Sequence, residues 1–334
     1  MAVSQIGRYF DGGASGTGFA TSTDGGATWT SGALPGLTTH QGAPPYERAT
    51  DPVVAYDPEH GVWLAQSLLL DETASGPHGS AVVVNRSTDG GLTWSAPAAT
   101  ANNATGLGGQ PVVQPDGDVI VPAANAFETA IIAFRSTNGG ASWSNAITIT
   151  STPSHNVAGN LRTGPLPSAE IDAAGRVYVV WQDCRFRKGC KVNDIVMTTS
   201  DDGVTWSPIT RVPIDTVNSS VDHFIPGIGV DPSTSGGSAR LGLTYYFYRA
   251  SRCGTRRTPC QLEVGYVQSN DGGTNWSNHT DVAGPFPVTW TADTTQGRMV
   301  GDYISTSWLG GRAYGAFAST PWPTRRPTTR RRAR

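Results

Sequence analysis

The octet Ser22-Thr-Asp-Gly-Gly-Ala-Thr-Trp29 occurs in five versions along this chain of 334 residues. The versions share the frame Ser/Thr-x-Asp/Asn-x-Gly-x-Thr/Ser/Asn-Trp and occupy residues 22–29, 87–94, 136–143, 199–206 and 269–276. Their starts are 65, 49, 63 and 70 residues apart, so the repeating unit is much longer than the octet itself. Repetition at such a period is typical of an architecture built from repeated units.

The chemistry of the octet predicts a tight turn between two strands. Its third position carries Asp24, Asp89, Asn138, Asp201 or Asp271. An acid or amide close to glycine favours a hairpin, because glycine adopts the positive φ that the connection needs. The Ser/Thr and Asp side chains can accept or donate hydrogen bonds within the turn, and the closing tryptophan can pack on the layer below. We therefore interpret the octets as scaffold and not as repeated catalytic or metal sites.

Composition places the chain among β-rich proteins. It has 41 glycines and 23 prolines, and 37% of its residues are hydrophobic. This is ample for a sizeable core but too rich in Gly and Pro for a helical protein. No apolar run approaches the about 20 residues that cross a bilayer. The segment from Met1 to Gln5 lacks a basic start and a hydrophobic run, so we expect no signal peptide in this sequence.

The net charge of −2 is unevenly distributed. Residues 321–334 hold six arginines and no acid, so residues 1–320 carry a net charge of −8. An acidic body argues against nucleic acid as a partner. We expect residues 1–320 to form one domain and residues 321–334 to be a disordered or non-native tail, with an arm for anionic surfaces as the alternative.

Four cysteines form two local pairs, Cys184 with Cys190 and Cys253 with Cys260, each within a polar, Arg-rich loop. The pairs lack Cys-x-x-Cys spacing and have no histidine close by, so zinc is not expected. Two small disulfides fit better and imply an oxidising compartment, which favours secretion.

Between the octets, β-branched and aromatic segments alternate with turns, four strands to a module. Repeated four-stranded antiparallel sheets of this size predict an all-β protein, a six-bladed β-propeller with incomplete terminal blades. If the two ends share one closing blade, the count falls to five. The sequence offers no first strand for the opening blade, so ring closure is the least supported part of this prediction.

Propeller geometry predicts that the starts of the first strands and the ends of the second strands surround one mouth, opposite the octets. The residues predicted there are Asp51, Gln110, Arg162, Asp222, His223, Asp302 and Tyr303, with Asp11, Asn125, Asp183, Arg185, Tyr248 and Arg249. A cluster of arginines binds carboxylates through paired hydrogen bonds. Each residue alone also has an ordinary explanation, as a surface charge, a turn residue or a satisfied core histidine. Together they come from different modules and predict a site for an acidic ligand.

The octets resemble the Asp-box of the sialidase superfamily, and they extend over nearly the whole chain. Wider patterns are similar to secreted bacterial sialidase-like proteins: Asp51-Pro-Val-Val, Arg162-Thr-Gly164, Val179-Val-Trp-Gln-Asp183, Tyr245-Tyr-Phe-Tyr-Arg249 and Gly301-Asp-Tyr303. The resemblance implies a six-bladed propeller. It is weakly specific for activity, because receptors, assembly factors and other hydrolases also carry Asp-boxes.

Sialidases use three arginines on the substrate carboxylate, an Asp acid/base, and a Tyr nucleophile activated by a Glu. The resemblance implies Tyr303 as nucleophile, Asp11 as acid/base, and Arg185 and Arg249 as two of the arginines. The Arg-Ile-Pro motif of the first arginine is absent, and Arg162 is the candidate substitute. The activating Glu is expected near Leu166, where only Glu170 lies close.

Two functions follow as hypotheses. One is a retaining, sialidase-like exo-glycosidase that removes sialic acid or a related acidic sugar, with Asp51, Asp302 and His223 also at its substrate site. The other is a non-catalytic propeller that binds an acidic glycan or a protein at the same mouth. A lyase or hydrolase for another acidic sugar is a third possibility. We expect a monomer that needs no cofactor and no obligatory metal.

Overall fold

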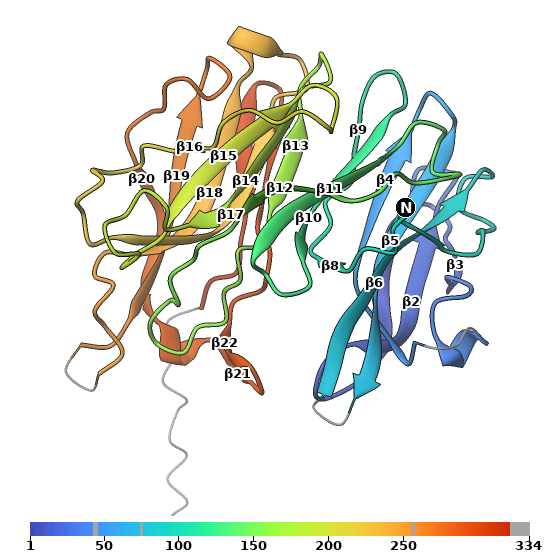
Figure 1. Cartoon of the computed structure of the whole chain (residues 1–334), viewed down its shortest axis with the longest axis horizontal. Coiled ribbons are helices and arrows are strands. Elements are labelled where there is room, and N and C mark those ends of the chain that lie inside the picture. Colours follow the sequence, from blue (N-terminus) through green and yellow to red (C-terminus); the bar gives the residue numbers. More distant parts are fainter. Residues whose placement is uncertain (43–45, 74–75, 256–257, 321–334) are drawn as a thin grey trace, which may run out of the picture.

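The structure, a computed structural model, describes residues 1–42, 46–73, 76–255 and 258–320. Within these ranges the chain forms 24 β-strands and no α-helix, so the all-β prediction is confirmed (Figure 1). Three single 3-10 turns complete the secondary structure: η1 (Thr39–Gln41), η2 (Gly236–Ser238) and η3 (Val288–Trp290). No helix in the described ranges is long and apolar enough to cross a membrane. The predicted tail, 321–334, lies outside the described residues.

Four antiparallel sheets, here called blades, make up most of the chain. The first contains β4 (Arg48–Asp57), β5 (Val62–Thr73), β6 (Gly76–Ser87) and β7 (Ala98–Ala99). The second contains β8 (Gly106–Leu107) and β9 (Val112–Val113), both paired with β10 (Val119–Asn125), then β11 (Ala130–Ser136) and β12 (Ile147–Ser151). The third contains β13 (Ser168–Ile171), β14 (Val177–Asp183), β15 (Asp194–Ser200) and β16 (Thr210–Arg211). The fourth contains β17 (Asp222–Val230), β18 (Leu241–Tyr248), β19 (Gln261–Ser269) and β20 (Thr280–Pro287).

The two ends of the chain form partial sheets. Strands β1 (Ala2–Arg8), β2 (Ala14–Thr21) and β3 (Thr30–Ala33) join the first blade through one bridge between β2 and β4. At the other end lie two hairpins, β21 (Ala292–Thr294) with β22 (Gly297–Met299) and β23 (Ser305–Leu309) with β24 (Arg312–Ala316).

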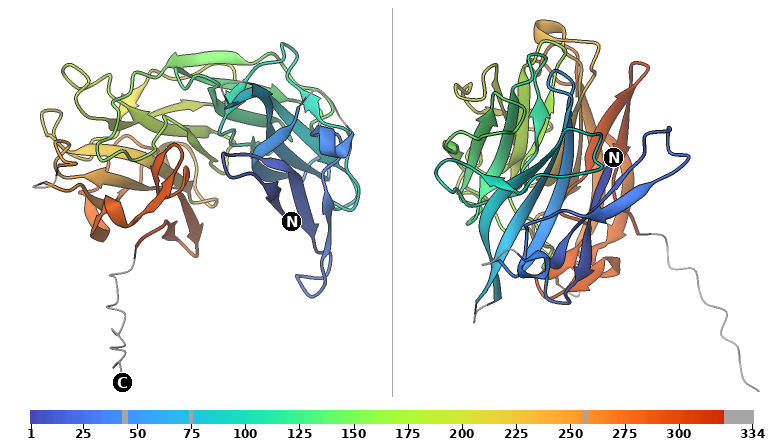
Figure 2. Two further views of the ribbon diagram at one scale, coloured as in Figure 1. Left: turned by 90° about the horizontal axis from the view of Figure 1, so that it is seen from below. Right: turned by 90° about the vertical axis from the view of Figure 1, so that its right-hand side faces the viewer.

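The sheets follow one another around an open arc, with the N-terminal strands and the C-terminal hairpins at its two ends (Figure 2). The described strands of the two ends belong to different sheets, so a shared closing blade is not observed. No closed ring of sheets is formed by the described strands, and the count of six blades stays a prediction.

The core lies between neighbouring blades, and β14 shows why. Its residues Val177, Val179 and Trp181 pack against the second blade, whereas Tyr178 and Val180 pack against the fourth. Side chains alternate between the two faces of a strand, so a strand buried on both faces is apolar throughout. The continuous run from Val177 to Trp181, fully buried, meets this requirement and fixes the stacking of the sheets.

The octets form turns between the last two strands of each blade, as the sequence predicts. In the second octet Ser87 Oγ donates to Asp89 Oδ1 (2.8 Å), and Asp89 accepts from the Thr93 backbone N–H (2.9 Å) and from Thr93 Oγ1 (2.6 Å). The Trp94 indole N–H donates to the Gly91 carbonyl (3.2 Å). These bonds satisfy the turn from within, so the octet is a structural staple.

Two details of the octets differ from the prediction. In the fourth octet Asp202, and not Asp201, accepts from the Ser200 hydroxyl (3.1 Å) and the Thr205 N–H (2.6 Å). Asp201 instead accepts two hydrogen bonds from Arg176 (2.7 and 2.9 Å). In the first octet Trp29 is not an apolar plug, because 55% of it is exposed at the open end of the arc.

Asp89→Asn should remove a pH-dependent contribution to the free energy of unfolding. The hydrogen bonds from Thr93, and from Ser87, lower the pKa of Asp89 to about 2, below its ordinary value of about 3.9. A lowered pKa stabilises the fold above about pH 4, and this stabilisation is lost as the pH falls towards 2. We expect the variant to melt at a lower temperature than the parent at pH 7 and to approach it at pH 2. Asn138, which binds Ser142 in the same way, shows that an amide fits the turn. An equal difference in melting temperature between variant and parent at pH 7 and at pH 2 would contradict this account.

Both predicted disulfides are present: Cys184–Cys190 and Cys253–Cys260, with Cα–Cα distances of 4.9 and 4.8 Å. Each closes one loop at the end of the second strand of a blade, after β14 and after β18. The prediction of two local pairs is therefore confirmed.

Candidate active site

Tyr303 lies at the centre of a group of predicted site residues that the structure brings together from separate segments. The Arg162 guanidinium forms an ion pair with the Asp302 carboxylate (2.9 Å). The charges that act most strongly on the Tyr303 hydroxyl are those of Asp51, Asp302, Arg162 and Glu128. These five residues, called here the Tyr303 cluster, come from four separate segments of the chain. Glu128 is the member that the sequence analysis did not predict.

Asp51 owes its position to a bulge in β4. The pairing of β4 with β5 shifts between Thr50 and Val53, and Asp51 there has a positive φ of 49°. Strand β17 has the same bulge, where Ile225 has a φ of 47° and also precedes a proline. Because the buried Ile225 occupies this position in another blade, the fold does not need a carboxylate at Asp51. A polar residue held in a strained conformation points to function.

Arg162 and Asp302 meet because two loops are hydrogen-bonded to each other. The Arg162 N–H donates to the Arg298 carbonyl (2.7 Å), and the Arg298 N–H donates to the Asn160 carbonyl (2.7 Å). Leu161 and Arg298 thereby form a parallel bridge. This pairing fixes the loop before β13 against β22, and Asp302 follows β22 after a short turn.

Glu128 lies in the loop after β10, with a φ of 55°. A methyl group on Gly164 would lie 2.5 Å from Glu128 Oε2, so the Arg162-Thr-Gly segment leaves room for this carboxylate only because it ends in glycine. One residue in the sequence pointed to this loop: Asn125, which was predicted at the mouth. Its Oδ1 accepts a hydrogen bond from the Thr129 backbone N–H (2.8 Å), which anchors the loop that contains Glu128.

Burial shifts the protonation of the cluster. Desolvation raises the pKa of Asp51, of Asp302 and of Glu128 above the ordinary carboxyl range, and the Arg162 charge opposes each shift. Burial, followed by the charges of Asp51 and Asp302, raises the pKa of Tyr303 well above its ordinary value of about 10. Tyr303 is therefore protonated at rest, beside carboxyl groups that burial makes easier to protonate than exposed ones.

A cavity of about 410 Å³ opens beside the cluster. Its size lies within the range of sites for small ligands. Glu128, Arg162 and Asp302 line it, together with Asn160, Thr163 and Gln296. A methyl group on Gly108 would lie 2.9 Å from the Tyr303 hydroxyl and 3.3 Å from the lining residue Leu166. The hydroxyl therefore lies near one side of this cavity, although Tyr303 and Asp51 are not among its lining residues. We call it the Tyr303 cavity.

The other predicted site residues have local partners instead. Asp11 pairs with Arg48 (2.7 Å), which lowers the pKa of its carboxyl. Arg185 binds Asp183 (2.6 Å), and Arg249 binds Glu263 (2.9 Å) and Asp281 (2.6 Å). Glu170 lies on β13, where burial raises its pKa to about 7. None of the four is among the groups that act most strongly on Tyr303.

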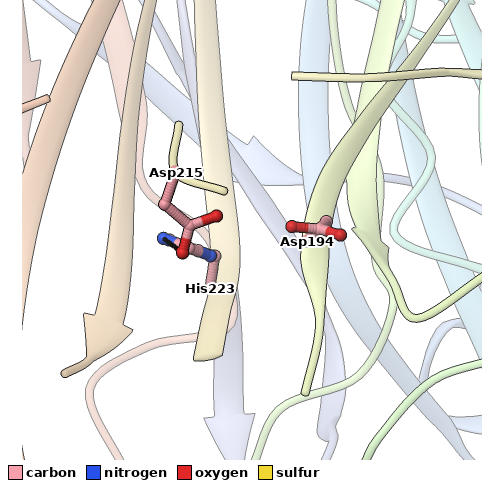
Figure 3. A group of neighbouring side chains, drawn as sticks. All are labelled: Asp194, Asp215 and His223. Atoms are coloured by element: carbon pink, nitrogen blue, oxygen red, sulfur yellow. Dashed lines mark ion pairs between the residues drawn. The ribbon is translucent and has the colours of Figure 1, made fainter. Parts of the chain in front are cut away.

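His223 belongs to a buried ionic network in the third and fourth blades. Its imidazole lies 3.9 Å from Asp215, and Asp194 lies opposite on β15 (Figure 3). This trio has the donor set of a metal site. However, Arg187 binds both carboxylates (2.5 and 2.8 Å), and Arg211 Nε binds Asp194 (2.8 Å). Two guanidinium groups occupy the carboxylates, so the network is structural.

His223 itself is neutral at neutral pH. It is almost fully buried, and its ring lies against those of Tyr245 and Phe247. This burial lowers its pKa to about 4. The structure therefore places His223 in the core of the blade, away from the open mouth where it was predicted.

The chain belongs to the family of the BNR repeat-like domain, whose family model matches residues 13–229. This confirms the resemblance that the octets carry. No curated protein matches the chain significantly.

Solved structures show the same fold at low identity. A Hadza microbial sialidase, Hz136, superposes with a TM-score of 0.52 at 15% identity, over 90% of this chain and 57% of its own. The α-L-arabinofuranosidase Arb93A of Fusarium graminearum superposes with a TM-score of 0.53 at 14% sequence identity, over 80% of this chain and 73% of its own. The NanB sialidase of Streptococcus pneumoniae superposes with a TM-score of 0.50 at 13% sequence identity, over 90% of this chain and 60% of its own. The chain thus spans less than two thirds of the length of these two sialidases.

Proposed function

We propose that the protein is a glycoside hydrolase that acts on an acidic sugar in the Tyr303 cavity. The observation that carries this proposal is the Tyr303 cluster: one tyrosine among three carboxylates with raised pKa values and one arginine, at the edge of a cavity. Structures of the same fold include sialidases and an arabinofuranosidase, which supports a carbohydrate as the substrate. Sialic acid or a related acidic sugar is the substrate class that we propose.

Each member of the cluster has a role in this proposal. The Tyr303 oxygen attacks the anomeric carbon while its proton passes to Glu128 or Asp51, and the bond to the leaving oxygen breaks as the other carboxyl group protonates that oxygen. Water then releases the sugar from Tyr303. Arg162 binds the substrate carboxylate, and Asp302 orients Arg162. We assign the acid role within the cluster because Arg48 keeps Asp11 ionised, and an ionised carboxylate has no proton to give.

Binding of an acidic glycan without turnover is the second candidate. The observation that favours it is the ion pair between Arg162 and Asp302, since a substrate carboxylate must compete with Asp302 for the guanidinium. Both candidates fit an exported protein with two disulfides, and we propose that the protein functions outside the cytoplasm.

Arg162→Gln tests the acidic-sugar proposal. A panel of fluorogenic α-sialosides, β-glucuronides, α-L-arabinofuranosides and β-galactosides would be offered to the parent and the variant. We expect turnover of an acidic member, with a kcat/KM that falls about 10–100-fold in the variant, as for the loss of a charge-assisted hydrogen bond. Arg176→Gln removes the same charge from an exposed ion pair away from the cluster and should leave the rate within about twofold.

Three results would count against the proposal or refine it. Turnover of a neutral member alone, unaffected by Arg162→Gln, would contradict the acidic substrate. No turnover by the folded protein, with an acidic sugar bound, would favour the binding function. Equal losses in both variants would show that Arg162 has no special role.

A further inference from the structure

A second cavity, of about 760 Å³, lies between the first disulfide loop and the loops around Ser219 and Ser251. It is lined by both lysines of the whole chain, Lys188 and Lys191, together with Arg252, Arg187 and His155. No carboxylate is among its lining residues; Asp222 lies behind the wall, 3.9 Å from His155. We call it the lysine cavity.

The cations of the lysine cavity are available to a ligand. Lys188, Lys191 and Arg252 are exposed, and no ion pair reaches them within the described ranges of the chain. Most other arginines at this mouth are neutralised, as Arg185 is by Asp183 and Arg249 by Glu263. Three free positive charges on a body with a net charge of −8 create a local field that attracts anions.

The floor of the lysine cavity is rigidly built. The side chain of Arg187 is only 2% exposed and binds Asp194 and Asp215. Its Nη1 also donates to the carbonyls of Thr216 (3.1 Å), Val217 (3.0 Å) and Ser219 (3.2 Å), which form the opposite wall. The Cys184–Cys190 disulfide closes the loop above it. The backbone that carries Lys188 and Lys191 is thus held in place around an open space, which lowers the entropic cost of binding.

The lysine cavity and the Tyr303 cavity are neighbours. His155 lines the first, and the next residue, Asn156, lines the second, together with Val157, Asn160 and Arg162. Because consecutive Cα atoms are about 3.8 Å apart, the loop from His155 to Arg162 is a wall common to both cavities. A chain of sugar units that runs across this loop would contact both cavities.

We infer that the lysine cavity binds carboxylate or sulfate groups along an acidic polysaccharide whose terminal unit lies in the Tyr303 cavity. The choice of a glycan as the ligand rests on the proposed function, whereas the preference for anions rests on the cavity itself. The site selects polyanionic chains over short or neutral glycans, since each additional anionic unit meets a cation that is already in place.

The two lysines allow a direct test on the whole protein. An N-hydroxysuccinimide ester acylates Lys188, Lys191 and the α-amino group of Met1, which precedes β1 and serves as internal reference. Mass spectrometry would follow each site with polygalacturonate oligosaccharides, dextran sulfate or neutral dextran present. At a probe concentration of about ten times Kd, about a tenth of the cavities remain unoccupied. The rate of acylation of both lysines should therefore fall about tenfold, while the rate at Met1 is unchanged. Dextran should have no effect.

Binding by variants gives an independent readout. We expect Lys188→Gln/Lys191→Gln/Arg252→Gln to weaken the affinity for the effective probe about tenfold, by fluorescence anisotropy, as three partly exposed ion pairs would. Arg8→Gln/Arg176→Gln/Arg312→Gln removes the same charge outside both cavities and should change the affinity less than twofold. Protection by polygalacturonate points to carboxylates, and protection by dextran sulfate alone points to sulfates.

The inference is overturned if neither polyanion protects the lysines, or if the control variant loses as much affinity as the cavity variant. Its failure is distinct from failure of the proposed function. Turnover of a small acidic glycoside without lysine protection would remove this inference alone. Lysine protection without any turnover would remove the hydrolase and leave the anionic glycan site.

Discussion

Replacing Tyr303 by phenylalanine should lower kcat by at least about a thousandfold and leave the affinity for an acidic sugar within about twofold. Loss of a residue that acts as the nucleophile costs several orders of magnitude in rate, because no remaining group can form the covalent bond. Phe keeps the ring, so contacts that position the sugar remain. The rate would be measured with the best fluorogenic glycoside, and the affinity with its product.

The environment of Tyr303 makes this a clean substitution. Although 39% of the residue is exposed, its hydroxyl lies against Gly108 and among the carboxylates of the cluster. No hydrogen bond from this hydroxyl is found within the described part of the chain, so its removal leaves no partner unsatisfied. We therefore expect an unchanged melting temperature, and the loss of rate can be attributed to chemistry.

Tyr314→Phe is the matched control. Tyr314 lies on β24, is also partly exposed, and belongs neither to the Tyr303 cluster nor to the lining of the Tyr303 cavity. It should retain the parent rate. A Tyr303→Phe variant that turns over substrate as fast as the Tyr314→Phe control would exclude Tyr303 as nucleophile and move the search to Asp51 and Glu128.

The turns could be predicted from the sequence because their hydrogen bonds are local. Asp89 and Thr93 are four residues apart, and the hydrogen bonds that the Asp89 side chain accepts all come from within the octet. The fourth octet was misassigned because two consecutive acids, Asp201 and Asp202, fit the pattern. The choice between them depends on Arg176, which lies 25 residues away and binds Asp201. A local pattern cannot contain that contact.

The site could be predicted only in part, for a related physical reason. Asp51 lies at the bulge of β4, and Asp302 and Tyr303 lie just before β23, so their positions along the strands were enough to predict that they are neighbours. Arg185 and Arg249 are also at strand ends, but nearby carboxylates bind them. Glu128 was missed because it lies in a loop, with a positive φ, and only the folded chain shows that Gly164 makes room for it.

Replacing Arg187 by methionine should lower the free energy of unfolding by about 3–5 kcal/mol. This is the typical cost of breaking a buried ion pair, because the charge left behind has lost its partner and cannot regain its hydration. Arg187 and Asp194 have side chains that are 2% and 1% exposed, and Arg187 also binds Asp215 and three backbone carbonyls. Methionine keeps much of the volume but none of these bonds. Urea denaturation at pH 7 would measure the difference.

Arg176→Met provides the control for this loss. Arg176 binds Asp201 through two hydrogen bonds as well, but the two side chains are 41% and 70% exposed. Exposed pairs contribute at most about 1 kcal/mol, since both ions are nearly as well solvated when apart. We therefore expect a severalfold smaller effect from the same substitution at position 176. Similar losses at the two positions would show that burial is not what makes Arg187 important.

A double variant separates the lost attraction from the unpaired charge. In Arg187→Met/Asp194→Asn the carboxylate that Arg187 would leave unpaired is replaced by a neutral amide. The two substitutions together should therefore lower the free energy of unfolding by less than the sum of the single ones, by about 0.5–3 kcal/mol. Arg211 Nε also binds Asp194, which limits this recovery. Additive losses would mean that Asp194 is satisfied by Arg211 alone, and that Arg187 stabilises the protein chiefly by binding the carbonyls of the loop from Thr216 to Ser219.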